Sequence, residues 1–292
     1  MSTANPASQK PWIVQVFADL ITRPSGLIGL ILVLGHLIIA FISPLIVPYD
    51  VTAMSAAEIL QGPTDQHWLG TDKLGRDIFS RVLMGGRNAL IITLIATPIA
   101  LLWGGMLGIY LGYRGGWLDE AIMRVVDAVL ALPGILPLMV LVTIFGTGNQ
   151  VLIPTLAFFY GIPVIRVIRA ATHDVVARDF VEAARARGER AWTILTRELL
   201  PNVSDALMVE GAMRLSWMLL GFSSISFLGF GVAPPTPDWG LMVAEARTYM
   251  WIAPWGVLGP VLALSSLIIG INLLADALAK TLGIDRARKA VV

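Results

Sequence analysis

The chain has no cysteine and few charged residues among its 292 residues. Only 14% of the residues are Asp, Glu, Lys or Arg, whereas soluble domains carry about 25%. The lack of cysteine excludes disulfides and thiolate chemistry, but leaves the compartment undecided. The formal net charge of +1 argues against nucleic acid as a partner, because binding a polyelectrolyte requires a large excess of positive charge.

Motifs for catalysis are also missing. The sequence has no G-x-x-x-x-G-K-[ST] phosphate loop for ATP. Its three histidines are scattered and form no H-E-x-x-H zinc pair. Ser223 and Ser224 suggest an intramembrane serine nucleophile, but no histidine is placed as its base, so a hydroxyl satisfied within its helix is favoured. We therefore expect no catalytic residue, no metal site and no cofactor bound by this chain.

What the chain does have is long apolar runs, which make up most of its 56% hydrophobic residues. A helix needs about 20 apolar residues to cross a bilayer, and lipid cannot satisfy the polar groups of an open backbone. The sequence therefore predicts an all-α integral membrane protein with six transmembrane helices. The third run is free of charge only from Ala128. The predicted spans are Leu27–Val47, Ala89–Tyr113, Leu118–Gly148, Gln150–Ile168, Ser204–Phe230 and Thr248–Ala275.

The positions of Lys and Arg predict the orientation. With the N-terminus inside, fifteen of these residues face the cytoplasm, five face outward, and Arg214 lies within a span. Both termini are therefore expected in the cytoplasm. The predicted organisation is a cytoplasmic lead (1–26), a first helix (27–47), an extracytoplasmic segment with an interfacial helix (48–88), a core of five spans (89–280) with a cytoplasmic coupling segment (171–203), and a cytoplasmic tail (281–292).

Several features of the spans indicate how they pack. Gly104, Gly108 and Gly112 repeat every four residues, which favours close approach of a neighbouring helix of the same chain. Glu210 and Arg214 are spaced i,i+4 and can pair with each other; a structural pair is favoured over contact with a transported solute. Asp127 lies one turn after Arg124, so a local ion pair is the leading interpretation for it, with a pathway role as the alternative.

Two outward-facing segments join the spans. Gly70 and Gly75 bracket a turn, and the sequence from Ile78 predicts an amphipathic helix lying along the interface. After the fifth span, the proline-rich stretch 234–237 cannot be regular helix. We expect Trp239, Tyr249 and Trp251 near the lipid headgroups.

The cytoplasmic segment 178–202 is a basic, amphipathic island, since seven arginines lie between Arg166 and Arg197. Gly188 predicts a sharp turn between two helices, and Pro201 is expected to end the second. On that second helix, Trp192, Leu195 and Leu199 are predicted to form one apolar stripe. The first helix carries Glu182, Arg185 and the small residues Ala183 and Ala184, and its face could seat in a groove of another protein.

These residues resemble a known signature. Glu182-Ala183-Ala184, Gly188 and Leu200-Pro201 look like the EAA motif of ABC-importer transmembrane subunits. LGTDKLGRDIFSR before the second span and FLGFGVAPPTPDWGLM after the fifth resemble the second permease subunit of dipeptide, oligopeptide and nickel importers. The resemblance covers essentially the whole chain. One departure is the ending Asn272-Leu273-Leu274-Ala275-Asp276-Ala277-Leu278, where the family often has N-L-L-G-D-G-L.

The resemblance implies a type I ABC-importer permease fold in the bacterial inner membrane. The implied partners are a homologous, non-identical permease subunit, two ATPase subunits that hold ATP and Mg, an extracytoplasmic binding protein, and membrane lipid. A peptide-like solute is the leading cargo, with nickel, glutathione and sugar-derived compounds as alternatives. The implied coupling residues, which engage the ATPase, are Glu182, Ala183, Ala184, Arg185, Arg187, Gly188, Trp192, Leu195 and Pro201.

Two other classes are compatible with some of the sequence. A secondary transporter would also contain prolines and buried charges, but it would show related halves, and neither the island nor LGTDKLGRD occurs twice. A membrane-embedded hydrolase would need a nucleophile and a base, which the sequence does not supply.

Overall fold

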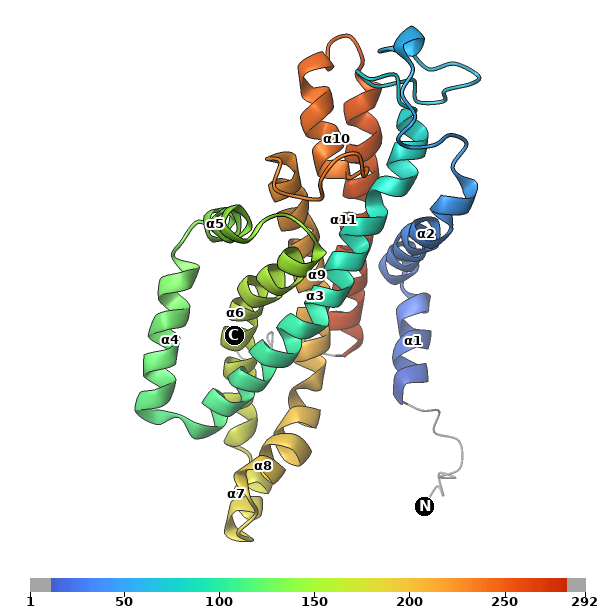
Figure 1. Ribbon diagram of the computed structural model, residues 1–292. Helices are drawn as coiled ribbons and strands as arrows, with labels where there is room; N and C mark the ends of the chain where they lie inside the picture. The colour runs from blue at the N-terminus through green and yellow to red at the C-terminus, as the bar shows by residue number, and fades with distance from the viewer. Residues whose placement is uncertain (1–11, 283–292) are drawn as a thin grey trace, which may run out of the picture.

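The computed structural model describes residues 12–282, which form a bundle of helices elongated in one direction (Figure 1). The α-helices are α1 (Trp12–Thr22), α2 (Pro24–Ile46), α3 (Ile78–Arg114), α4 (Gly116–Leu130), α5 (Ile135–Phe145), α6 (Asn149–Val176), α7 (Asp179–Ala186), α8 (Ala191–Thr193), α9 (Leu200–Phe227), α10 (Trp239–Ala246) and α11 (Trp255–Thr281). Short elements are the 3-10 helices η2 (Ala56–Glu58) and η4 (Arg247–Tyr249), and the π-helix η3 (Ile194–Leu199).

Helices α3, α6, α9 and α11 form the centre of the bundle, and α2 packs along α11. The α7–α8 elbow lies at one end, whereas α10 and the loop around residues 50–75 lie at the other (Figure 1). The central core joins α3, α6 and α9 through apolar side chains such as Ile92, Leu156 and Phe222, each fully buried. Burial of such side chains stabilises the bundle by about 1.5–3 kcal/mol each.

Most of the predicted spans correspond to helices of sufficient length and apolar composition to cross a membrane. Four helices, α2, α3, α6 and α11, are long and apolar enough to cross a membrane. The bent pair α4 and α5 would add a fifth. Helix α9 matches the remaining predicted span in position, but it carries Asp205, Glu210 and Arg214 and is not among these four. The described residues therefore contain four or five apolar spans.

The third predicted span is not one straight helix. Helices α4 and α5 meet at an angle of 85° across residues 131–134. Pro133 lies in this break, where its missing N–H and its ring oppose a continuous helix. The sequence prediction missed this bend, because an apolar run indicates burial in lipid but not the direction in which the helix points.

Two further boundaries differ from the sequence prediction. The expected interfacial helix at Ile78 is the beginning of α3, which continues through Gly85 and Gly86 without a break. The expected polar lead contains the helix α1, and only residues 1–11 of it lie outside the described range. Most of the predicted tail, residues 283–292, also lies outside that range.

The glycine repeat of α3 packs against α6, as predicted. A Cβ atom at Gly108 would lie 2.8 Å from the carbonyl oxygen of Ile165, and one at Gly112 would lie 2.7 Å from Cβ of Thr172. Trp103 adds a hydrogen bond from its indole N–H to the carbonyl oxygen of Ala157, 3.0 Å away. Without side chains at the glycines, the two backbones approach closely enough for extensive dispersion contact.

Candidate functional site

The elbow predicted around Gly188 is present. Helix α7 ends at Ala186, and Gly188 has φ +75°, a left-handed conformation that glycine adopts without steric cost. No atom lies within 4 Å of the place a Cβ would occupy at Gly188. The requirement for glycine here therefore comes from the backbone angle and not from a lack of space.

The second helix of the elbow does not end at Pro201, contrary to the prediction. Helix α8, the π-helix η3 and α9 follow one another without a loop from Ala191 to Phe227. The N–H of Leu200 bonds to the carbonyl oxygen of Leu195, five residues earlier. This wider turn precedes Pro201, whose ring would clash with a carbonyl in a regular α-helix. The elbow is thus the beginning of the same continuous helix that becomes α9.

An apolar cluster holds the elbow to the bundle. Val181 and Ala184 on α7, and Ile194 and Leu199 on η3, are fully buried. They pack in one cluster with buried side chains of α3, α6 and α9, namely Ile109, Val164, Ile168, Val175 and Val203. Close-packed interiors resist deformation, so a force applied to α7 is transmitted to all three helices.

The remaining predicted coupling residues form an exposed surface. Glu182, Ala183, Arg187 and Gly188 are exposed on or beside α7. Trp192 is 64% exposed, so it does not belong to the buried stripe with Leu195 and Leu199. The stripe prediction is wrong at this position, because the indole lies on the outer face of the helix that buries Leu195 and Leu199. An exposed aromatic side chain of this size is typical of a protein interface.

Arg185 contacts the same chain. Its guanidinium lies 4.7 Å from the centre of the Tyr113 ring, and Nη2 donates a hydrogen bond to the carbonyl oxygen of Tyr113, 3.5 Å away. Tyr113 is in the last turn of α3, where the helix dipole favours a cation. This contact adds a polar link between α7 and α3 beside the apolar cluster.

The predicted ion pair within α9 is present. Nε of Arg214 lies 2.7 Å from Oε1 of Glu210, and these side chains are 15% and 6% exposed. The Arg214 N–H is not aligned on that oxygen, so the contact is an ion pair without a good hydrogen bond. Because an unpaired charge in a low-dielectric interior is very costly, the two residues make each other's burial possible.

Asp127 pairs with a different residue from the one predicted. Its carboxylate binds Arg166 of α6 and not Arg124. A second carboxylate of α4, Asp119, accepts two hydrogen bonds from Arg169 of α6. The sequence spacing within α4 could not reveal partners on another helix. Together the two pairs tie α4 to the half of α6 that leads into α7.

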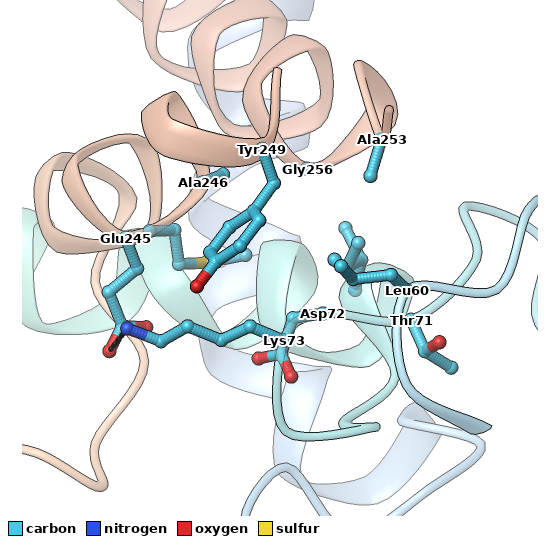
Figure 2. Close-up of a pocket in the computed structure, with 11 residues that line it drawn as sticks. Leu60, Thr71, Asp72, Lys73, Glu245, Ala246, Tyr249, Ala253 and Gly256 are labelled. Carbon is cyan, nitrogen blue, oxygen red and sulfur yellow. Dashed lines mark ion pairs between the residues drawn. The ribbon is translucent and has the colours of Figure 1, made fainter. Parts of the chain in front are cut away.

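The opposite end of the bundle is held by buried ion pairs. Arg76 binds Asp72 at 2.6 Å and Glu245 of α10 at 2.9 Å. Arg81 is 1% exposed, and its guanidinium donates a hydrogen bond to the carbonyl oxygen of Val51. Figure 2 shows Lys73 reaching toward Glu245 beside the ring of Tyr249. The recess lined by Lys73, Glu245 and Tyr249 has a volume of only about 30 Å³, which is enough for about one water molecule and too little for a peptide.

Trp239 of α10 is buried at this end of the bundle. Its side chain is 4% exposed and packs over Gly85 and Gly86 of α3, and its N–H bonds to the carbonyl oxygen of Val82 at 2.8 Å. The prediction of a headgroup contact is therefore wrong for Trp239. Trp251, at 91% exposed, is free for such a contact. The adjacent glycines Gly85 and Gly86 were the sequence signal for this packing, since two glycines in a helix make room for a large ring.

The chain matches a known family of membrane proteins. Residues 104–284 match the model of the binding-protein-dependent transport system inner membrane component. The chain is 39% identical over 241 residues to the glutathione transport system permease protein GsiD of Pectobacterium atrosepticum, covering 82% of this chain and 80% of that protein. It is 32% identical over 269 residues to the dipeptide transport system permease protein DppC of Alkalihalophilus pseudofirmus, covering 92% and 88%.

The chain belongs to this family of binding-protein-dependent transport system inner membrane components. It is the permease component of an ABC importer, homologous to dipeptide and glutathione transport permeases. Its place is the inner membrane, in agreement with the apolar helices. The family resemblance drawn from the sequence motifs is thereby confirmed.

Proposed function

We propose that this chain pairs with a related but non-identical permease subunit and encloses a solute pathway with it. Six spans would cross the membrane, namely α2, α3, the bent pair α4–α5, α6, α9 and α11, with both termini in the cytoplasm. Two ATPase subunits, which bind ATP and Mg, would dock at the elbow end. A binding protein would deliver the solute at the end that carries α10. The chain itself performs no catalysis.

The observation that carries this proposal is the continuity of the elbow with the bundle. The exposed face of α7 offers Glu182, Ala183 and Arg187 to a partner, while Val181 and Ala184 on its other face are buried. Because α8 runs through η3 into α9, movement of a docked ATPase would tilt α9 directly. A rigid lever of this kind couples a distant binding event to two arrangements of the bundle.

A peptide-like solute is the cargo we infer. The similar permeases serve dipeptide and glutathione transport, and glutathione is itself a tripeptide. The basic rim of the elbow, Arg187 and Arg190, would orient an acidic surface of the ATPase.

The backbone angle of Gly188 provides the test. A β-branched residue at φ +75° is strained by about 1–2 kcal/mol, so Gly188→Val should distort the elbow, abolish most transport and reduce co-purification of the ATPase subunits. Gly188→Asn is the matched control, because Asn tolerates this conformation, and it should retain both activities. Normal transport by Gly188→Val in reconstituted vesicles would refute the coupling role.

A further inference from the structure

Arg214 lines a cavity on one side of the bundle, whereas its ion-pair partner does not. The cavity measures about 380 Å³ and lies between the α4–α5 break, α6 and α9. Arg214 is its one charged lining residue, and Glu210 is not part of the lining. The volume is in the range of about 300–1,000 Å³ that is common for small-molecule sites.

The rest of the lining is apolar with a few polar groups. Tyr160 and Ser224 contribute hydroxyls, and the Tyr160 hydroxyl lies against Gly221, where a Cβ would collide with it. Trp217 is half-exposed, one helical turn from Arg214. Apolar walls with a small number of convergent polar groups are typical of sites for organic solutes.

The geometry of the pair leaves Arg214 able to bind a second anion. Glu210 lies 2.7 Å from Nε of Arg214, and within residues 12–282 neither Nη1 nor Nη2 of Arg214 donates a hydrogen bond. The guanidinium fork matches a carboxylate in a bidentate arrangement. Glu210, buried behind it, would hold the guanidinium in place.

Depth within the helix favours a solute carboxylate over a lipid phosphate. Arg214 is fourteen residues from the start of α9 and thirteen from its end, about 20 Å from either. Headgroup phosphates lie near the ends of spanning helices and not at their centres. With α9 spanning the membrane as proposed above, an anion bound at Arg214 therefore lies away from the headgroups at either end of the helix.

A separate and more open hollow lies further along α4 and α6, toward the elbow end. It is lined by Glu120, Met123, Arg124, Asp127, Arg166 and Arg169. Val129 and Pro163 of the cavity are followed along the two helices by these charged residues. The apolar cavity and the polar hollow thus succeed each other on one side of the bundle, as a solute route would require.

We propose that this cavity is a transit site for the carboxylate of a peptide-like solute, with Arg214 as its ligand and Glu210 as a positioning residue. The proposal rests on the permease function above, and it predicts that the cavity favours anions. Because the chain contains no native cysteine, labelling of a single introduced cysteine on this chain reports the accessibility of the cavity.

The test uses single cysteines in the assembled complex. Trp217→Cys lines the cavity, and the control Met213→Cys is an exposed neighbour of Arg214 that does not. Each is treated with an anionic or a cationic methanethiosulfonate, and labelling of this chain is followed by mass spectrometry. Relative to the ratio of the two rates at a free thiol in solution, Trp217→Cys should favour the anionic reagent about tenfold or more. Adding Glu210→Gln and Arg214→Gln together should remove the preference, and Met213→Cys should show none.

Protection experiments identify the anion. Diglycine should slow labelling of Trp217→Cys, whereas diglycine amide and phosphatidylglycerol should not. Protection by phosphatidylglycerol alone would assign the site to lipid phosphate and overturn the proposal. The same rate ratio as at a free thiol, or no reaction with or without ATP, would also overturn it.

Transport assays separate this proposal from the permease function. Glu210→Gln/Arg214→Gln, which leaves neither charge unpaired, should lower solute uptake at least tenfold while ATPase co-purification and ATP hydrolysis remain, and Arg214→Lys alone should keep part of the uptake. Loss of the ATPase subunits from the unmodified complex would instead refute the coupling assignment. Unchanged uptake by Glu210→Gln/Arg214→Gln would refute the transit site alone.

Discussion

The elbow end of the bundle is held by apolar packing, whereas the opposite end is held by buried charge. At the elbow, Val181, Ile194 and Leu199 are fully buried, and the charged side chains lie on the exposed face. At the other end, Arg81 is almost completely buried near Asp72 and Glu245. Both ends contain short elements joined by turns, so the difference does not follow from secondary structure.

The two kinds of contact suit different tasks. Apolar packing is non-directional and leaves the outer face of the elbow free for a partner. Ion pairs depend on geometry and fix one arrangement of irregular loops, since a displaced charge loses its partner inside a low-dielectric region. The elbow can therefore move as part of the bundle, while the other end holds the loop 50–77 against α10.

The largest expected effect is at the buried face of α7. Val181→Asp would place a charge in the apolar cluster, which costs several kcal/mol, so we expect the elbow to detach and transport to be lost. Ala183→Asp, on the exposed face of the same helix, should leave the elbow folded. Limited proteolysis distinguishes the two, because only Val181→Asp should become sensitive between α7 and α9. Equal sensitivity of both variants would contradict the division of α7 into two faces.

An intermediate effect is expected from the buried arginine at the other end. Arg81→Met leaves Asp72 and Glu245 paired with Arg76, but it leaves the Val51 carbonyl oxygen without the Arg81 hydrogen bond and should destabilise this end by about 1–3 kcal/mol. Cleavage should then appear in the loop 50–77, whereas ATPase co-purification should persist. Arg87→Met provides the control, because Arg87 makes no ion pair within residues 12–282, and it should behave like the unmodified protein. Loss of the ATPase subunits from Arg81→Met would show that the two ends are not independent.

The smallest effect is expected from an exposed pair. Lys280 binds Asp276 at 2.6 Å near the end of α11, with both side chains nearly half-exposed. Exposed pairs of this type contribute about 0–1 kcal/mol, so Asp276→Asn should leave thermal stability and transport unchanged. A large loss of stability would show that this position is buried in the assembled transporter.

Local signals in the sequence were sufficient for part of this architecture. The glycine repeat 104–112 predicted a close helix contact, and Gly188 predicted the elbow, because both depend on the lack of a side chain at a given position. The Glu210–Arg214 pair followed from helical spacing alone. Contacts between residues of the same helix, and backbone conformations that require glycine, can be predicted from such local signals.

Other features required partners that the sequence does not place. Asp127 was expected to bind Arg124 on its own helix, but Arg166 of α6 lies closer. Trp192 was expected in the buried stripe, but its side chain is exposed. Pro201 was expected to end a helix, and a π-turn accommodates it. The partner of Asp127 lies on a neighbouring helix, and the π-turn is a backbone geometry that residue spacing does not report.

The sequence by itself determined the class of the protein, since apolar runs, scarce charge and three ordered motifs are properties of the chain as written. It also determined which residues need helix, turn or glycine. Only the tertiary structure decided that Asp127 meets Arg166 of another helix and that Arg214, not Glu210, faces a cavity. The physical reason is the distance along the chain over which each effect acts. Helix propensity and residue spacing act within one or two helical turns, whereas the cavity is formed by side chains from four helices, α4, α5, α6 and α9.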